Sequence, residues 1–373
     1  MTAPLTPLAA GLPATVPFVG PEAQERGRGR PFRARIGANE SVFGPSPAAV
    51  AAMREAAEGV WRYADPENHD LRAALAEALG VPGAALVVGE GIDGLLGLTV
   101  RLFAGPGDAV VTSLGAYPTF NYHVAGFGAR LVTVPYRGDA EDPEALAAAA
   151  RTQGARLVYL ANPDNPMGSF HGAARIAALL EALPEGCLLC LDEAYGEFAP
   201  EALLPLDPED RRVIRFRTFS KAYGLAGLRV GYAIAHPDTA AAFDRVRNHF
   251  GVNRMAQAGA LAALGDGAHL ASVRAAVAAS REEIGRIAAA NGLTALPSAT
   301  NFVAVDCGGG PAGGGLARAV LAGLLARDIF VRMPGVAPLD RCIRIGCGRD
   351  ADMALLAKAL PGVLEEARAG AAG

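Results

Sequence analysis

The sequence predicts an α/β fold: a large domain with a mostly parallel, seven-stranded sheet covered by helices, and a smaller α+β domain after it. The chain has 373 residues, enough for about two domains. Hydrophobic residues make up 51% and charged residues 19%, a composition that excludes a disordered chain. Seven short runs are apolar throughout rather than alternating, which is typical of strands in a sheet that is covered on both faces.

Residues 1–45 come first and are expected to form an irregular arm on the side of the smaller domain. The segment is rich in Pro, Gly and Arg, and its arginines include Arg26, Arg28, Arg30, Arg33 and Arg35. These arginines could form a patch for a polyanion. Such a run more often forms a solvated arm or an arm that contacts a partner, and this interpretation fits the net negative charge of the chain better than a polyanion-binding patch does.

Helices and strands are expected from residue 46 onward. Ser46-Pro47 is typical of an N-cap followed by a first-turn proline, and His69–Leu79 has helical spacing that Gly80 ends. The apolar runs that predict the strands are Ala84–Val88, Ala109–Thr112, Arg130–Val134, Arg156–Leu160, Cys187–Leu191, Val213–Phe216 and Val230–Ala235. These elements predict a large domain over residues 46–265. Residues 266–373, which include the Gly-rich stretch 308–315 and end in an Ala/Leu-rich helix, predict the smaller domain.

Charge and cysteine content narrow the class of protein. The formal net charge of −4 argues against a protein built mainly to hold nucleic acid. No apolar run reaches the roughly 18 residues of a membrane helix, and the proline-broken N-terminus lacks the basic start of a secretory signal. Cys187 and Cys190 form a CxxC inside an apolar run, which favours packed thiols over zinc. We therefore expect a cytoplasmic protein without a metal site.

Lysine is almost absent from this chain. Of the 34 basic residues, 32 are Arg and two are Lys, namely Lys221 and Lys358. Arginine keeps its proton in proteins, whereas lysine can lose it and become an amine nucleophile. The two lysines are therefore candidates for chemistry that arginine cannot perform.

Polar residues follow four of the predicted strands. These segments are Gly89–Gly94, Asn162–Pro166, Asp192–Tyr195 and Thr218–Lys221. Ligands of open α/β sheets bind beyond the carboxyl ends of the strands. If these strands are neighbours, a helix N-terminus, an amide, a carboxylate, a phenol and an amine meet in one crevice.

The first of these segments, Gly89-Glu90-Gly91-Ile92-Asp93-Gly94, matches the GxGxxG pattern of dinucleotide-binding sites. The match is weak, because no acidic residue stands cleanly at a second strand end about 20 positions later. A tight turn of small residues explains the pattern as well. A third interpretation is that free backbone N–H groups at a helix start hold a phosphate of another small ligand.

Asp192 and Lys221 point to one cofactor. Asp192 follows an apolar strand, so its carboxylate needs a cation, either an arginine or the protonated ring nitrogen of a cofactor. Lys221 stands among small and apolar residues, and Arg229 follows as a candidate anion clamp. An amine nucleophile, a buried carboxylate, a phenol with an amide, and a phosphate cup are what pyridoxal phosphate requires.

Three ordered motifs then resemble a known family, the fold-type I pyridoxal-phosphate aminotransferases. They are Asn162-Pro-Asp-Asn-Pro-Met-Gly168, Asp192-Glu-Ala-Tyr195 and Ser220-Lys-Ala-Tyr-Gly-Leu-Ala-Gly-Leu-Arg229. The chain is most similar to the histidinol-phosphate aminotransferase branch, which residues 39–47, 62–66 and 342–346 also match. The resemblance covers about residues 36–360.

The resemblance implies a role for each candidate residue. Lys221 would form the imine with pyridoxal 5'-phosphate and shuttle a proton, and Asp192 would pair with the ring nitrogen. The other cofactor-binding candidates are Asn165 and Tyr195 at the phenolate oxygen, Tyr122 on the ring face, Gly91, Ile92, Asp93, Ser220 and Arg229 at the phosphate, and Tyr63 from a partner subunit. The substrate-binding candidates are Arg344, Arg332 and Asn39.

The implied activity is ping-pong amino-group transfer in a homodimer with shared active sites. The donor would be an amino acid or an amino-alcohol phosphate and the acceptor a 2-oxo acid, most closely a histidinol-phosphate:2-oxoglutarate pair in histidine biosynthesis. The stretch Arg332-Met333-Pro334-Gly335 is less polar than the branch pattern, which keeps an aromatic or other amino-acid donor open. An amino-acid-phosphate decarboxylase, a dinucleotide-dependent oxidoreductase and a non-catalytic regulator are further alternatives.

Overall fold

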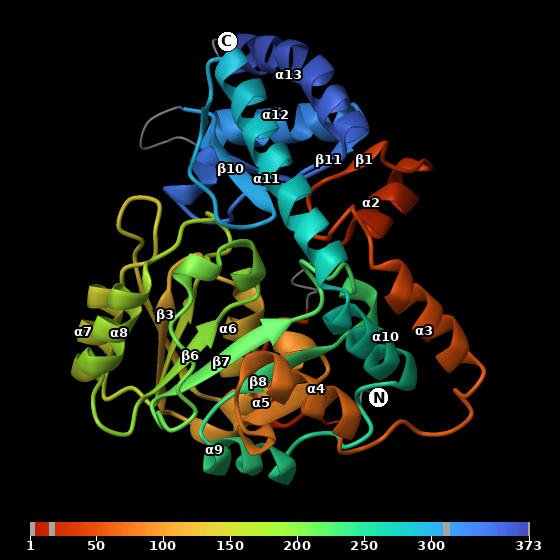
Figure 1. Ribbon diagram of the computed structural model, residues 1–373. Coiled ribbons are helices and arrows are strands. Elements are labelled where there is room, and N and C mark those ends of the chain that lie inside the picture. Colours follow the sequence, from red (N-terminus) through yellow and green to blue (C-terminus); the bar gives the residue numbers. More distant parts are fainter. Residues whose placement is uncertain (1–3, 15–18, 309–313, 372–373) are drawn as a thin grey trace.

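The structure is a computed structural model that describes residues 4–14, 19–308 and 314–371. Figure 1 shows a lower part built around one large sheet and an upper part that contains the C-terminus, with the long helix α11 (Gly267–Ala290) reaching from one to the other. None of the helices within the described ranges combines the length and apolar character that crossing a membrane demands. The predicted domain boundaries after residues 45 and 265 stay predictions.

The large sheet contains all seven predicted strands, in the order β2-β8-β7-β6-β5-β3-β4. Their bounds are β2 (Leu86–Gly89), β3 (Ala109–Ser113), β4 (Arg130–Val134), β5 (Leu157–Ala161), β6 (Leu188–Asp192), β7 (Val213–Thr218) and β8 (Gly231–Ile234). Strand β8 runs opposite to the other six strands of this sheet, which all run in the same direction. The carboxyl ends of β2, β7, β6, β5 and β3 therefore share one edge. The first predicted run begins too early, because Gly83–Ala85 forms a 3-10 turn before β2.

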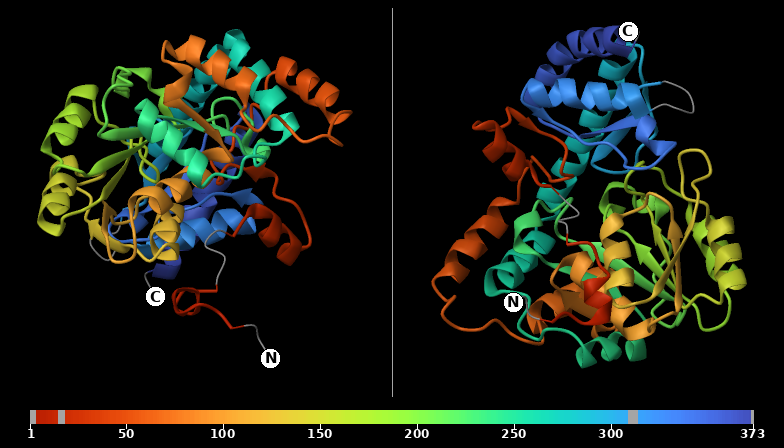
Figure 2. Two further views of the ribbon diagram at one scale, coloured as in Figure 1. Left: turned by 90° about the horizontal axis from the view of Figure 1, so that it is seen from below. Right: turned by 180° about the vertical axis from the view of Figure 1, so that it is seen from behind.

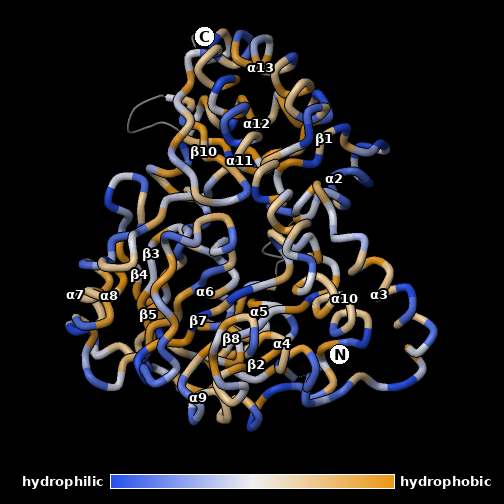
Figure 3. Tube along the Cα trace, viewed as in Figure 1, coloured by the Kyte–Doolittle hydropathy of each residue, from blue (hydrophilic) through white to orange (hydrophobic). Residues whose placement is uncertain are grey.

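Helices cover both faces of this sheet, which explains why its strands are mostly buried; the edge strand β4 is largely exposed. One apolar cluster joins the sheet to α5 (Gly91–Phe103) and α6 (Pro118–Gly126), and another joins it to α7 (Pro143–Gln153) and α8 (Ala173–Ala182). The rear view in Figure 2 shows these two helix layers on opposite sides of the strands, and the hydrophobic colour of Figure 3 follows the strands between them. The lower part also contains α3 (Pro47–Ala57), α4 (His69–Leu79), α9 (Pro237–Ala242) and α10 (Arg254–Gly265).

Two predicted helix ends are confirmed in detail. The Ser46 hydroxyl accepts a hydrogen bond from the Ala49 N–H at the start of α3, with Pro47 at the first helical position. Helix α4 ends at Gly80, whose φ of 66° is left-handed and therefore favours glycine.

The upper part is built on two small sheets. Strands β9 (Thr294–Ala295), β10 (Phe302–Asp306) and β12 (Cys342–Gly346) form an antiparallel sheet, and β1 (Ala34–Arg35) pairs in parallel with β11 (Ile329–Phe330). Together with α11, α12 (Gly314–Ala326) and α13 (Asp350–Ala371), these strands enclose a continuous apolar core. The predicted Ala/Leu-rich helix is therefore present as α13. Most of the Gly-rich stretch, residues 309–313, lies outside the described residues.

The N-terminal arm is more ordered than predicted. Residues Pro7–Ala10 (α1) and Pro21–Arg28 (α2) are helical, so the expectation of an irregular segment is wrong there. Helix α2 has proline at its first position and ends at Gly29 in a left-handed conformation, the two signals that define such a helix.

Several arginines of the arm form intramolecular ion pairs. Arg28 and Arg30 both contact Asp328, the latter at 2.8 Å, and Arg35 pairs with Glu22. These ion pairs lie within the chain, and Arg30 stays more than half exposed, which agrees with the expected solvated run. Contact of the arm with a partner stays a prediction.

Candidate active site

The four predicted strand ends do converge. Strands β5, β6 and β7 are direct neighbours, with Asp192 opposite Ala161 on one side and opposite Phe216 on the other. The polar segments after these strands therefore meet at one edge of the sheet. Because β2 points the same way across β8, the N-terminus of α5 lies at this edge too.

Lys221 lies in the loop after β7 and is half-buried. Its Nζ donates a hydrogen bond of 3.0 Å to the Asn39 carbonyl and lies 5.7 Å from the centre of the Tyr195 ring. Burial, with the positive charges of Arg344 and Arg229, lowers the pKa of Lys221 to about 8. The amine therefore reaches its neutral form near physiological pH. The other lysine, Lys358, is exposed on α13 and far from this loop in sequence and in fold.

Asp192 ends β6 and is 6% exposed. Its Oδ2 accepts a hydrogen bond of 2.7 Å from the Tyr159 hydroxyl, and its Oδ1 accepts one of 2.9 Å from the Ala194 N–H. Burial raises the pKa of Asp192 to about 6, against the effect of these donors. Among the described residues both hydrogen-bond partners are neutral, so the alternative of a pairing with arginine is wrong here.

Tyr195 and Asn39 form a pair beside Lys221. The Asn39 Nδ2 donates a hydrogen bond of 2.9 Å to the Tyr195 hydroxyl oxygen, and both residues are buried. Asn39 has a φ of 56°, a left-handed conformation that asparagine tolerates better than most residues. Burial raises the pKa of Tyr195 far above its usual range, so its hydroxyl keeps its proton. The Asn39 Oδ1 is buried and has no hydrogen-bond donor within the described part of the chain.

Asn165 and Arg344 meet at the same edge. The Arg344 Nη1 donates to the Asn165 Oδ1 at 2.6 Å, and burial lowers the pKa of Arg344 to about 10. Arg332 and Arg344 stand opposite each other in an antiparallel bridge, as predicted from adjacent strands. The Arg332 Nη2 donates to the Val19 carbonyl of the N-terminal arm. Two guanidinium groups thus come from paired backbone positions in the upper part.

The expected phosphate cup brings the start of α5 together with Ser220 and Arg229. Arg229 donates to the Ser220 hydroxyl at 3.4 Å, and no carboxylate pairs with its guanidinium in the described ranges. Gly91 begins α5 with a φ of 80°, and a side chain there would come within 2.5 Å of Arg229. The left-handed φ favours glycine here, and a side chain would also displace the end of Arg229. Ile92 is buried in the first turn of α5.

The acidic residue of that first turn has a partner of its own. The Asp93 Oδ1 lies 3.2 Å from the His123 Nε2 of α6. This contact ties the start of α5 to the helix beside it.

Two predicted residues lie apart from this group. Tyr122 is 36% exposed on α6, and no contact joins it to Lys221 or Asp192 in the described part of the structure. Tyr63 is 80% exposed and packs against Phe250, with ring centres 4.8 Å apart. In the described part of this chain, neither side chain makes a hydrogen bond to Lys221 or Asp192, and the roles predicted for Tyr122 and Tyr63 stay predictions.

Sequence reasoning missed Tyr117 and Tyr159. Tyr117 lies at the end of the short loop between β3 and α6, and Asp93, Asp192 and Arg229 are close enough to influence its pKa, which burial raises to about 12. Its place just beyond a strand end was the available signal, since Tyr122 lies a full turn into the helix. Tyr159 is fully buried in the middle of β5. A hydroxyl inside an apolar strand requires a partner, which is the signal that could have found it.

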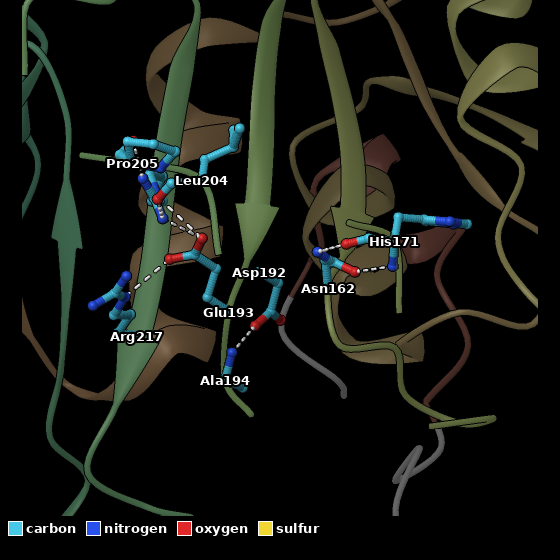
Figure 4. A network of polar contacts seen from close by, with 9 residues as sticks. Asn162, His171, Asp192, Glu193, Ala194, Leu204, Pro205 and Arg217 are labelled. Atoms are coloured by element: carbon cyan, nitrogen blue, oxygen red, sulfur yellow. Dashed lines mark hydrogen bonds and ion pairs between the residues drawn. The ribbon is translucent and has the colours of Figure 1, made fainter. Parts of the chain in front are cut away.

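A second carboxylate, Glu193, lies immediately beside the first and is 1% exposed. It accepts hydrogen bonds from Arg215 at 3.0 and 2.6 Å and from Arg217 at 2.9 Å. Figure 4 shows Glu193 directed toward Arg217, while the contact of Asp192 runs to Ala194. Both arginines come from β7, so this cluster ties the end of β6 to its neighbour.

Comparison with known proteins places this geometry in a family. The family model for aminotransferase class I and II matches residues 35–360. Histidinol-phosphate aminotransferase 2 of Ralstonia nicotianae is 39% identical over 341 residues, 90% of each chain. An aromatic amino acid aminotransferase of Nocardia farcinica is 38% identical over 340 residues, 88% of this chain and 90% of that protein.

Among solved structures, a histidinol-phosphate aminotransferase from Sinorhizobium meliloti in complex with pyridoxal-5'-phosphate is 57% identical. It superposes with a TM-score of 0.94 over 98% of this chain and 99% of that one. The matches cover nearly the full length, and they include every strand end described above. This chain therefore belongs to the aminotransferase class I and II family.

Proposed function

We propose that this chain is a pyridoxal 5'-phosphate-dependent aminotransferase that moves the amino group of histidinol phosphate to 2-oxoglutarate. The observation that carries the proposal is the meeting of Lys221 and Asp192 at one sheet edge beside Arg229. The similarity to histidinol-phosphate aminotransferases, at 39% and 57% identity, supports this choice of substrate.

The residues at this edge fit pyridoxal phosphate at three points. Asp192 is a buried carboxylate whose described hydrogen-bond partners are neutral, which suits a cationic ring nitrogen. Arg229, Ser220 and the free N–H groups at the start of α5 suit a phosphate. Lys221 has the lowered pKa that an amine nucleophile needs. Tyr117 is better placed than Tyr122 to cover the ring, so we assign that contact to Tyr117.

The cofactor, when bound, withdraws electrons from the substrate α-carbon, and the protein supplies binding and proton transfer. The Lys221 Nζ holds and moves the proton, because its pKa of about 8 allows both charge states near neutrality. Tyr195 and the Nδ2 of Asn165 would hold the phenolate oxygen of the cofactor as hydrogen-bond donors. The Oδ1 of Asn165 accepts a 2.6 Å hydrogen bond from Arg344, and this contact fixes the orientation of the amide and leaves its Nδ2 as the donor.

Arg344 and Arg332 would bind the anionic end of the substrate. Histidinol phosphate carries a phosphate and glutamate a carboxylate, so one site must accept both anions. Two guanidinium groups from adjacent strands offer more donors than a single carboxylate uses. Asn39, whose Oδ1 lacks a described donor, faces the same region and remains a candidate for a substrate amine contact.

Half-reaction spectroscopy tests the proposal. Purified holoenzyme is mixed with histidinol phosphate, glutamate or phenylalanine, and the conversion of the cofactor is followed by absorbance. We expect rapid conversion with histidinol phosphate and glutamate, and no conversion with any donor in Lys221→Arg, which keeps the charge but not the chemistry. A wild-type protein that binds no pyridoxal phosphate would contradict the proposal.

An aromatic amino acid aminotransferase is the second candidate. Met333 places an apolar side chain next to Arg332, and a relative of that activity is 38% identical. Conversion by phenylalanine at a rate above that of histidinol phosphate would favour this candidate.

We also propose a cytoplasmic homodimer in which Tyr63 reaches the partner subunit's cofactor. Tyr63, Trp61, Val60 and Phe250 are all exposed large hydrophobic side chains, an arrangement that favours burial against a second copy. The five cysteines are free and buried, as is usual in a reducing compartment. Sedimentation of the holoenzyme tests the dimer.

A further inference from the structure

Tyr159 is a tyrosine with no exposed surface in the middle of a fully buried strand. Its ring stacks on Phe120, with centres 4.5 Å apart and planes 19° from parallel. Its register partner on β6 is Cys190, and Asp192 lies two residues further on the same face of that strand. Tyr159 and Asp192 are therefore held toward each other by two neighbouring strands.

We propose that Tyr159 is the positioning residue of Asp192, holding its Oδ2 and keeping it a carboxylate, so that the cofactor ring nitrogen and not the acid carries their shared proton. This inference rests on the proposed function. The hydroxyl donates to Oδ2 at 2.7 Å, while the backbone N–H of Ala194 donates to Oδ1 at 2.9 Å. The carboxylate is thus fixed at both oxygens before any ligand binds.

The direction of the effect follows from the donor. Burial and the nearby charge of Asp192 raise the pKa of Tyr159 well above its usual value, so its hydroxyl keeps its proton and donates it. A hydrogen bond to a carboxylate stabilises the charged form and lowers the proton affinity of the acid. Without this bond, a proton shared between Asp192 and a ring nitrogen shifts toward Asp192, and the ring withdraws electrons less effectively.

Other ionisable groups surround Asp192 and must stay constant in a test. They are Glu193 and Cys190 on β6, Lys221 after β7, Tyr117 before α6, Tyr195 after β6 and Glu141 before α7. Replacing Tyr159 by Phe changes none of them. The substitution also retains the ring that stacks on Phe120 and removes one oxygen atom.

Tyr136 offers a matched control. It is a second tyrosine whose hydroxyl donates to a buried carboxylate, the Oδ1 of Asp164 at 2.9 Å. Tyr136→Phe therefore removes the same kind of hydrogen bond from the same kind of partner, but the carboxylate is not Asp192. A general cost of losing a buried hydroxyl affects both variants alike.

The test uses holoenzyme reconstituted with pyridoxal 5'-phosphate that is isotope-labelled at its ring nitrogen. We expect the nitrogen resonance of Tyr159→Phe to move toward the unprotonated position, with kcat lowered about tenfold, the effect of one hydrogen bond to a charged group. Tyr136→Phe should keep the wild-type resonance. A Tyr159→Phe holoenzyme with the wild-type resonance overturns the inference, and wild type that fails to bind the cofactor overturns the proposed function instead.

A second measurement tests the contact without replacing Tyr159. In protein labelled at the tyrosine ring carbon that bears the hydroxyl, Asp192→Asn should shift the Tyr159 resonance and leave that of Tyr136 in place. An unmoved Tyr159 resonance shows that the hydroxyl does not hold Asp192, and it overturns the inference.

Discussion

Asp192 and Glu193 are consecutive, buried carboxylates with opposite surroundings. Glu193 has two arginines from the neighbouring strand, and its charge is compensated within the chain. Asp192 has a phenol and a backbone N–H, which are neutral donors. A carboxylate that is satisfied by cations supports the fold, whereas one held only by neutral donors retains a charge that a ligand can use. The contrast assigns Glu193 to the stability of the fold and Asp192 to ligand binding, although the two acidic residues are adjacent.

The largest expected effect is on turnover in Asp192→Asn. The amide keeps the shape of the side chain but cannot pair with a cationic ring nitrogen. We expect kcat to fall by roughly 10²–10³-fold, the range for losing one electrostatic partner of developing charge. Steady-state kinetics measures it, and thermal unfolding of the ligand-free protein should show no loss of stability. Near wild-type kcat would remove the distinction between the two carboxylates.

Glu193→Gln should show the converse pattern, a large loss of stability with little change in kcat. Removing one charge from a buried ion cluster leaves Arg215 and Arg217 incompletely compensated, which costs about 3 kcal/mol of unfolding free energy. Urea denaturation measures the loss, and kcat measured well below the melting temperature should stay within a few-fold of wild type. An Asp192→Asn protein destabilised as strongly as Glu193→Gln would contradict the comparison.

The pH dependence of stability provides a smaller effect. Burial raises the pKa of Asp192 to about 6 from 3.8, so between these values the folded, ligand-free protein binds a proton that the unfolded chain does not. Its contribution to stability therefore falls as the pH rises from about 4 to about 6. We expect the stability of Asp192→Asn relative to wild type to increase over this window. A constant difference across it, measured by denaturation at each pH, would argue against the raised pKa.

The smallest effect is expected for an exposed ion pair. Arg30 is more than half exposed and contacts Asp328, which Arg28 also contacts. Exposed pairs contribute about 0–1 kcal/mol, so Arg30→Gln should change the unfolding free energy by less than about 1 kcal/mol. A loss as large as that of Glu193→Gln, in the same urea experiment, would mean that the arm is held as tightly as the core.

The strands were predictable because a sheet covered on both faces leaves continuous apolar runs in the chain. All seven runs became strands, with ends that differ by at most two residues from the predicted ones. Asp192 and Lys221 were predictable for a related reason, since Asp192 directly follows such a run and Lys221 stands in the short loop after the next one. Strand ends that are neighbours in the sheet place these polar residues together without further information.

The side-chain contacts of the site and of the N-terminal arm could not be predicted, because they join residues from separate segments of the chain. Whether the hydroxyl of Tyr159 meets Asp192 depends on the register of two strands, and the partner of Arg28 lies 300 residues away. Tyr117 was missed because it stands in the same short aromatic segment as Tyr122, the residue that the resemblance named. Only the start of α6 shows which of them lies at the sheet edge.

The scarcity of lysine also makes the molecule convenient for chemistry that targets amines. It has two lysine side chains: Lys358 is exposed on helix α13, and Lys221 is half-buried and donates a hydrogen bond to the Asn39 carbonyl. The pKa of Lys221 is also lowered to about 8, so the two amines differ both in access to a reagent and in protonation. Each added label then appears as one countable mass increment, which lets the occupancy of the recessed amine be followed directly.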